Sequence, residues 1–476
     1  MTTSKIQSAL VIALVAWGAL AFGAVYPWGY GALACASIAA GVIGLRAGSG
    51  WRRIPTGIGI AFALLLASIL IQQVPLPRAV LERISPATVA MLEQRNIAFA
   101  TAAVSAWHPL SIDPARTWTG LFLVVSLGAL WLGLAASFNE RTILRIAGGI
   151  ATVGLGLAVI GIAGLANHTG KVLGFWEPWS HAAPFGPFIN RNHYAGWMLM
   201  SIPLGAGYLM SMVGREIAEG PRSWRARMVW LSTRRANRMV MVTLALIVMV
   251  LSVLLSVSRS GIVCLAIGMV AFGWFALRKI ASRSRRALMI VCIAALAIGC
   301  VGWAGVDRIG SRFAALQSDG SGGRRAIWRD TVAVTRAFPV AGTGLDTFGL
   351  AMLVYQTADV YQHYEEAHND YLQVAAEGGL LVGLPALLLI VAAACQVWRR
   401  FRERADTVTT FWLRAGAAAG LLTIALQEAT EFSLQMPGNA ALFCVLAAIA
   451  VHRSSARPIR QIGGPSKLGP CEYRRS

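Results

Sequence analysis

The sequence predicts an all-α polytopic membrane protein with about twelve transmembrane helices. Of its 476 residues only 13% are charged and 56% are hydrophobic, whereas a soluble protein carries about 25% charged residues. The apolar residues are gathered in blocks of roughly 17–22 residues, and a helix of that length spans a hydrocarbon core of ~30 Å. The blocks lie near 6–24, 30–45, 58–74, 117–136, 143–166, 193–213, 239–257, 261–277, 287–305, 379–397, 408–427 and 437–452.

The first block has features of a signal peptide. It follows Lys5, and Ala19-Leu20-Ala21 resembles a cleavage site. Because further apolar blocks follow at once, we expect it to be retained as the first helix.

The basic residues give the expected orientation, since short cytoplasmic loops of membrane proteins are enriched in arginine and lysine. Five arginine-rich segments fall on one side, which we assign to the cytoplasm together with both termini. The other connecting segments have acids and bases in near balance and are expected in the periplasm. The net charge of +21 is thus a topology signal, and its dispersal argues against nucleic-acid binding. The basic segments are 46–56, 214–238, 278–286, 398–406 and the tail 453–476.

The cysteines and the glycine-rich stretches give no indication of disulfides, a zinc site or a nucleotide-binding loop. Six of the seven cysteines lie in apolar blocks and Cys471 lies in the basic tail, so no disulfide framework is expected. No Cys/His spacing typical of a zinc site is present. The stretch GTGLDTFG follows no strand and precedes no Gly-Lys-Ser/Thr, so it is interpreted as a tight turn between helices and not as a P-loop. We therefore expect no metal and no cofactor.

We expect residues 1–476 to form one membrane domain with two long periplasmic segments. In 75–116, apolar residues among charges predict a short helix on the membrane surface. Residues 306–378 are long enough for a small subdomain, with a Gly/Ser loop followed by a helix over about 325–337 that Phe338-Pro339 ends.

The stretch EEAHNDYLQVAAEGGLL, residues 365–381, places polar groups directly before the tenth apolar block. Its His-Asn-Asp run predicts a helix start at residue 370, because Asn and Asp favour the N-cap and the first turn. Glu377 follows Asp370 by seven residues, which puts both carboxylates on one helical face. The next two glycines loosen the backbone. Polar groups at a membrane boundary are costly unless they are paired or functional, so the stretch is a candidate site.

Three arginines lie on the side where the orientation predicts few. Arg191 lies at the mouth of the sixth block, Arg259 in the turn between the seventh and eighth, and Arg324 at the start of the loop helix. Guanidinium groups match phosphate oxygens, so converging arginines would suit a lipid pyrophosphate. A simpler alternative is that they reach phospholipid headgroups. Structural roles are expected for His108, His168, His181 and His193.

These motifs resemble the O-antigen ligase and O-antigen polymerase superfamily of bacterial envelope glycosyltransferases. The resemblance is carried by FINRNHYAGWM, SVSRSGIV, GGRRAIWRDTVAVTRAFPVAGTGLDTFG and EEAHNDYLQVAAEGGLLVGLPALL, with SIDPARTW also typical. Each motif is degenerate alone. Their order and spacing around a long outer loop, mainly between about 185 and 390, identify the family.

The resemblance implies a metal-independent enzyme of the bacterial inner membrane. Such an enzyme transfers a glycan from undecaprenyl pyrophosphate to an acceptor hydroxyl at the periplasmic face. Direct displacement at the anomeric carbon in one step would invert its configuration.

The resemblance also implies roles for individual residues. His368 would be the catalytic base, and Arg191 and Arg259 would bind the pyrophosphate. A histidine suits proton removal from a sugar hydroxyl near neutral pH, and arginines stabilise the charge of the leaving group. The main structural prediction is that these three residues meet in space. The remaining candidates are Arg324 for the pyrophosphate, and Asn369, Asp370 and Glu377 as orienting groups.

Several functions remain open at this point. A ligase would use lipid A-core as the acceptor in lipopolysaccharide biosynthesis, and a polymerase would use a second lipid-linked glycan to build O-antigen or exopolysaccharide. A protein O-oligosaccharyltransferase of the same superfamily would glycosylate a protein. A polyprenyl-lipid or polysaccharide flippase is the rival from another class, and it would be expected to carry polar residues or broken helices at mid-membrane depth. Membrane lipids are expected partners in every case.

Overall fold

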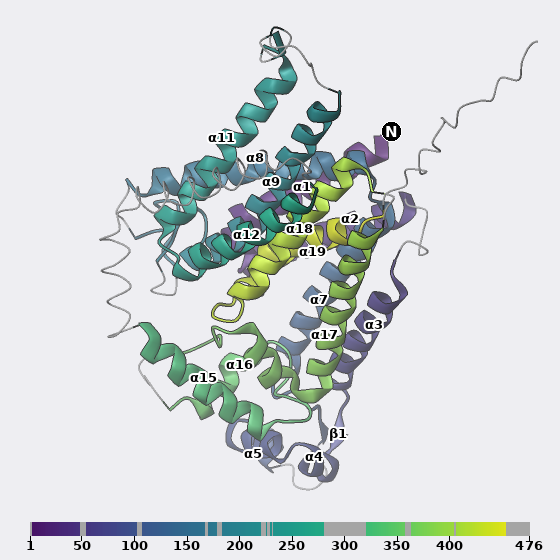
Figure 1. Ribbon diagram of the computed structural model, residues 1–476. Coiled ribbons are helices and arrows are strands. Elements are labelled where there is room, and N and C mark those ends of the chain that lie inside the picture. Colours follow the sequence, from purple (N-terminus) through teal and green to yellow (C-terminus); the bar gives the residue numbers. More distant parts are fainter. Residues whose placement is uncertain are drawn as a thin grey trace, which may run out of the picture.

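The computed structural model of the protein is almost entirely α-helical where it describes the chain (Figure 1). The predicted block 287–305, the start of the 306–378 segment, the tail from 454, and His168 and His181 lie outside the described residues. The structure describes residues 2–47, 54–101, 107–166, 170–178, 183–219, 225, 229–230, 232–279, 320–357, 363–403 and 406–453.

The all-α polytopic fold predicted from the sequence is confirmed. Within the described ranges, seven helices are long and apolar enough to cross a membrane. Four shorter apolar helices occupy further predicted blocks. The seven are α2 (Pro27–Ala47), α7 (Pro114–Ser137), α8 (Glu140–Gly164), α9 (Arg191–Glu219), α11 (Arg234–Ser256), α17 (Asp370–Arg402) and α18 (Val408–Gln427). The shorter four are α1 (Thr2–Leu20), α3 (Thr56–Ile71), α12 (Arg259–Lys279) and α19 (Pro437–Val451).

Polar N-cap residues begin several of the long helices. The Asp113 carboxylate accepts from the backbone N–H of Ala115 at 3.0 Å at the start of α7, and Asn139 Oδ1 accepts from Thr142 N at 3.1 Å at the start of α8. These side chains satisfy backbone donors that a helix leaves free in its first turn. Thr233, Asn369 and Thr407 do the same for α11, α17 and α18.

Helices α9 and α18 form the centre of the bundle and are the most buried of the candidate spans. Small residues let their backbones approach closely: a Cβ on Gly207 would clash with the Trp412 carbonyl, and one on Gly416 with the Pro203 carbonyl. Close packing of small residues holds helices together in lipid, where burying apolar side chains gains little. The buried Tyr194 of α9 also donates a hydrogen bond to Ser252 Oγ of α11 at 2.6 Å.

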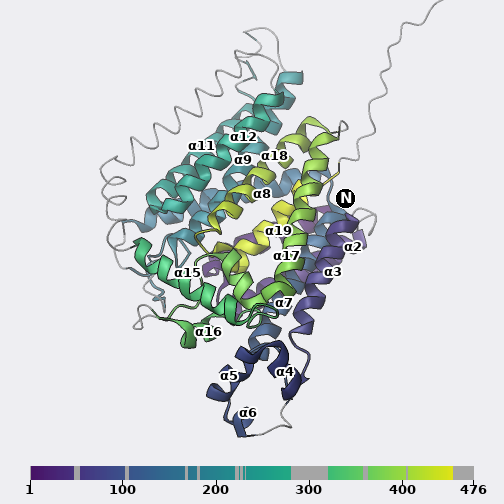
Figure 2. The same ribbon diagram turned by 60° about the horizontal axis from the view of Figure 1, so that its bottom comes forward.

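The two long connecting segments pack together at one end of the bundle and form a cap (Figures 1 and 2). The first contains three short helices where the sequence predicted one. Met91 of this segment shares a small apolar core with Ile327, Phe338 and Phe348 of the second. The cap consists of β1 (Leu76–Pro77), α4 (Arg78–Ile84), α5 (Pro86–Arg95), α6 (Ile97–Thr101), β2 (Trp107–His108), α15 (Gly320–Ala337) and α16 (Phe348–Tyr355).

The glycine-rich turn between α15 and α16 joins the cap to a break in α17. Gly379 has φ 53° and ψ −153°, a conformation available essentially to glycine alone, so the helical hydrogen bonds are interrupted there. The turn replaces them: Leu380 N and Leu381 N donate to the carbonyls of Pro339 and Val340, both at 2.9 Å. In return Gly344 N donates to the Glu377 carbonyl at 2.9 Å. The cap is therefore attached to the bundle through backbone hydrogen bonds.

We predict that Gly379→Ala destabilises the protein. A Cβ at this position would lie 2.6 Å from Gly342 N and from the Val340 carbonyl oxygen, and the backbone conformation is strained for any other residue. The expected loss is about 2–3 kcal/mol of unfolding free energy. Thermal unfolding in detergent, followed by circular dichroism, measures it. Gly383→Ala is the matched control in the same helix, because a Cβ there meets nothing within 4 Å. Equal melting temperatures for the two variants would contradict the prediction.

Candidate functional site

One buried carboxylate, Glu431, connects the elements of the candidate site. It lies in the turn between α18 and α19, with 1% of its side chain exposed. Its Oε1 accepts from Arg324 Nη2 at 2.6 Å and from Asn192 Nδ2 at 2.8 Å. Ser260 Oγ lies 3.4 Å from the same oxygen, and His368 Nδ1 lies 3.9 Å from Oε2. Residues from α9, α12, α15 and the loop before α17 thus meet at one side chain.

His368 is held at the edge of this cluster by the start of α17. Its backbone is left-handed, with φ 51°, which is unfavourable for a residue with a Cβ and is seen often at functional sites. The next residue, Asn369, caps α17 through Leu372 N and donates from Nδ2 to the Ala429 carbonyl at 2.9 Å. The imidazole packs edge-on against Phe432, with ring centroids 4.7 Å apart. Its side chain is 26% exposed, so solutes can reach it while Glu431 is sealed.

Arg191 and Arg259 are the first residues of α9 and α12, and their neighbours in the sequence belong to the cluster. Ser258 Oγ donates to Asn192 Oδ1 at 2.8 Å, and Asn192 in turn binds Glu431. The structure therefore brings the chain at Arg191, Arg259, Arg324 and His368 to the same place. The prediction that the side chains of His368, Arg191 and Arg259 meet stays a prediction.

The electrostatics of the cluster favour an ionised Glu431. Burial acts to raise the pKa of this carboxyl, but the adjacent His368 and the Arg324 guanidinium act in the opposite direction, and its pKa is below the ordinary value. A carboxylate that is both buried and charged orders the cations around it.

The other two predicted carboxylates lie apart from Glu431. Glu377 accepts from the backbone N–H groups of Asp346 and Phe348, both at 3.0 Å, and so supports the turn that enters the cap. Asp370 accepts from Gln435 Nε2 at 3.2 Å and lies beside Glu428. Seven residues along a helix correspond to a rise of about 10 Å, so two groups on one face still have different partners. Neither side chain has a hydrogen bond to Glu431.

Sequence analysis did not single out Glu431, Asn192 or Phe432. The available signal was the pair of acids in the short turn EATEF, between two apolar blocks where free carboxylates are costly. His193, expected to be structural, is buried at 5% exposure, and its ring packs against Phe432 with centroids 4.5 Å apart. Phe432 therefore contacts the rings of both His193 and His368.

The arrangement offers cations and an imidazole, and it offers few ligands for a metal. No group of three His, Cys, Asp or Glu side chains suited to a metal ion occurs among the residues that the structure describes. An arginine has five N–H donors in a planar fork, so Arg324 can bind Glu431 through one edge and an anion through another.

A comparison with protein families gives a match that includes α12, α15 and the loop before α17. Residues 244–387 match the O-antigen ligase family. The match confirms, over this segment, the resemblance to the O-antigen ligase and polymerase superfamily, and it supports a glycan-processing membrane protein of the ligase/polymerase type with lipid-linked glycan substrates. The segment includes Arg259, Arg324 and His368, while Arg191 and Glu431 lie outside it. No curated protein matches the chain.

The two glutamates of the turn between α18 and α19 should affect the stability of the fold with opposite dependences on pH. Burial, with Asp370 nearby, raises the pKa of the Glu428 carboxyl well above its usual value of 4.5. The folded state then holds a proton that the unfolded chain releases, so stability falls as the pH rises above 4.5. The pKa of Glu431 is lowered, so its contribution is present above 4.5 and is lost as the pH falls below it.

We therefore expect Glu428→Gln to be more stable than the wild type at pH 8, with a smaller difference at pH 5. Glu431→Gln should be less stable at pH 7 by about 1–3 kcal/mol, with the difference shrinking toward pH 4. Melting temperatures across pH 4–8 give both results, with the exposed Glu365→Gln as the control. Parallel curves for all four proteins would contradict the assignment.

Proposed function

We propose that this protein is a glycosyltransferase that moves a glycan from undecaprenyl pyrophosphate to a sugar hydroxyl at the periplasmic face of the bacterial inner membrane. The observation that carries the proposal is the convergence of His368 and Arg324 on the buried Glu431, at the end of the bundle where α9 and α12 begin with Arg191 and Arg259. A base and several fixed cations are the groups that transfer from a pyrophosphate needs.

In this proposal His368 removes the proton of the acceptor hydroxyl. Glu431 lies 3.9 Å from Nδ1, and a carboxylate on that side favours the tautomer with its proton on Nδ1. Nε2 is then left as the proton acceptor. Glu431 is thus a positioning residue that acts through His368, and Asn369 fixes the loop that presents the imidazole.

The arginines bind the donor and stabilise its leaving group. The acceptor oxygen forms a bond to the anomeric carbon while the bond from that carbon to the pyrophosphate oxygen breaks. The electron pair leaves with the undecaprenyl pyrophosphate, whose added charge is met by Arg324, Arg191 and Arg259, and the acceptor proton passes to His368. A single displacement inverts the anomeric configuration. Guanidinium groups supply the positive charge, so the proposed reaction is metal-independent.

The acceptor defines the subclass. A lipid A-core sugar makes the protein an O-antigen ligase, the end of a second lipid-linked glycan makes it a polymerase, and a protein hydroxyl makes it an O-oligosaccharyltransferase. A flippase is less well supported by the position of the buried charges. Arg414, the fully buried arginine of α18, pairs with Asp406 and donates to the carbonyls of Arg400 and His452 at 3.1 and 2.7 Å, all near helix ends and away from mid-depth.

The proposal predicts that His368→Ala strongly reduces the rate of transfer. Purified protein would be given a synthetic undecaprenyl-pyrophosphate oligosaccharide with lipid A-core, with a second lipid-linked oligosaccharide, or with an acceptor protein. Loss of a general base should lower kcat by about 10²–10⁴-fold. His363→Ala, at an exposed histidine of the same loop, should retain activity. Unchanged transfer by His368→Ala would overturn the assignment, and flipping of the donor without transfer to any acceptor would favour the flippase.

Glu431→Gln should lower kcat, because the residue positions the base, and should raise the KM for the donor to a smaller extent through Arg324. Glu431→Asp keeps the charge and should restore part of kcat. Initial rates of transfer over a range of donor concentrations give both constants. If Gln and Asp lose activity equally and in step with their loss of thermal stability, Glu431 has only a structural role.

A further inference from the structure

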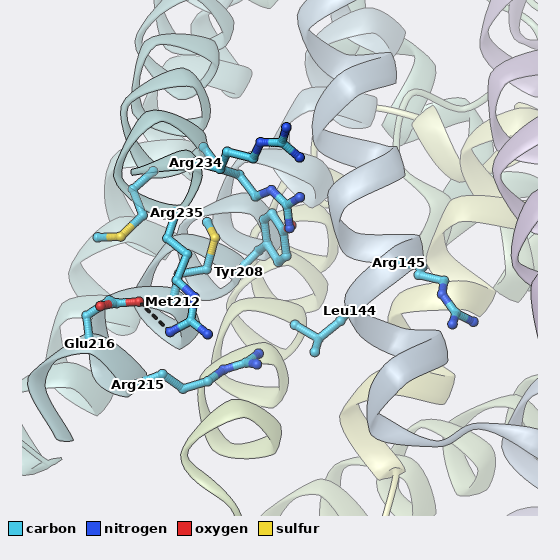
Figure 3. Close-up of a pocket in the computed structure, with 10 residues that line it drawn as sticks. Leu144, Arg145, Tyr208, Met212, Arg215, Glu216, Arg234 and Arg235 are labelled. Atoms are coloured by element: carbon cyan, nitrogen blue, oxygen red, sulfur yellow. Dashed lines mark hydrogen bonds and ion pairs between the residues drawn. The ribbon is translucent and has the colours of Figure 1, made fainter. Parts of the chain in front are cut away.

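A basic cavity, drawn in Figure 3, lies between three helices of the bundle. The course of α9 places it at the opposite end of the bundle from the candidate site. It occupies about 590 Å³ between α8, α9 and α11. Helix α9 starts at Arg191 in the candidate site, and the cavity is reached at its other end, around Met212 and Arg215. The sequence analysis expects this end to face the cytoplasm. Five arginines line the cavity: Arg145, Arg215, Arg234, Arg235 and Arg238.

The positive charge of the cavity is largely uncompensated. Glu216 is the acidic residue of its lining, and it is already engaged, since it accepts from Trp230 Nε1 at 2.8 Å and lies 3.5 Å from Arg235 Nη1. Across the described part of the chain, no acid lies within ion-pair distance of Arg215, Arg234 or Arg238. Several like charges around one space repel each other, and an anion placed among them removes that cost.

The remaining wall of the cavity is apolar or amphipathic. Leu144 of α8, Met212 of α9 and Met239 of α11 lie beside the arginines, together with the aromatic ring of Tyr208. Figure 3 shows Arg215 and Arg235 on one side of the space and Leu144 of α8 on the other. Arg145 extends from the far side of α8 and donates to Ser4 Oγ of α1 at 3.3 Å.

Helix α11 also exposes an apolar face, on the side turned away from the cavity. Val240, Met241, Leu244 and Ile247 each expose between 43% and 54% of their surface on this helix. On a transmembrane helix, an exposed apolar face of this kind contacts lipid chains. At 3.6 residues per turn these four positions lie on the side of α11 opposite the arginines that line the cavity. The apolar surface that borders the arginines is therefore the wall formed by Leu144, Met212 and Met239.

We propose that this cavity is a binding site for an anionic phospholipid, with the arginines holding the phosphate and the acyl chains lying against the wall of Leu144, Met212 and Met239. Basic pockets between transmembrane helices bind such headgroups. The enrichment of arginine in cytoplasmic segments explains why these residues lie on that side of the membrane. It does not explain why arginines of two helices, α9 and α11, line one cavity. The site is separate from the proposed transfer reaction and does not depend on it.

The test compares two triple variants that remove equal charge. Arg215→Gln/Arg234→Gln/Arg238→Gln alters the cavity, and Arg46→Gln/Arg399→Gln/Arg402→Gln removes exposed arginines at other helix ends on the same expected side. Native mass spectrometry of proteins from mixed nanodiscs counts retained phosphatidylglycerol against phosphatidylcholine. The wild type and the control should retain phosphatidylglycerol selectively. The cavity variant should bind phosphatidylglycerol at least about tenfold more weakly, a change of about 1.4 kcal/mol in binding free energy. The reason is that it lacks three of the arginines that attract the anionic headgroup.

Two further measurements keep the outcome interpretable. Inorganic phosphate and glycerophosphoglycerol are added as competitors, and displacement by either at the affinity of the lipid would show a site for soluble anions and overturn the proposal. Wild-type protein is also photo-crosslinked to a diazirine phosphatidylglycerol, which needs no variant to fold. Adducts on α9 and α11 near the arginines are expected. Equal lipid retention by both triple variants, or adducts spread evenly over the helices, would equally overturn it.

Discussion

Almost complete burial of the Glu431 carboxylate is the constraint on which the candidate site depends. A charge removed from water costs several kcal/mol unless donors and cations surround it, on the order of the whole stability of a small domain. Here the donors come from Asn192 and Arg324, with Ser260 and His368 beside them, and these residues are far apart in the sequence. The pairing of this one charge therefore requires four separate elements to pack around it. Because His368 lies on one of them, the same packing determines its position.

A second constraint acts on the backbone. The break in α17 at Gly379 leaves peptide groups that the turn after α15 satisfies, and Glu377 ties the start of α16 to the same place. The N-terminal part of α17 carries Asn369 and the adjacent His368, so the cap and the imidazole are positioned by one rigid junction. Glycine at positions 342 and 379 permits the close approach of the two chains.

The two ends of α9 and α11 differ in how their charged groups are paired. At one end, Asn192 of α9 joins Ser258, just beyond α11, and the charged groups are paired and mostly buried. At the other end, Arg215 and Arg234 are exposed around a cavity and have no described acidic partner. The long apolar stretches between them carry the bundle core of Trp197, Met249 and Val253.

The sequence by itself determined the helical membrane fold, the start of α17 at Asn369 and Asp370, the end of α15 before Phe338, and the tight turn after it. These follow from local rules, namely apolar block length, capping and the properties of Gly and Pro, and each acts within a few residues. The tertiary structure decided that Glu431 is the group on which His368 and Arg324 converge, and that Glu377 belongs to the cap junction. Sequence spacing places side chains on a helix face, but the partner that faces them is set by the packing of distant segments, which no local pattern contains.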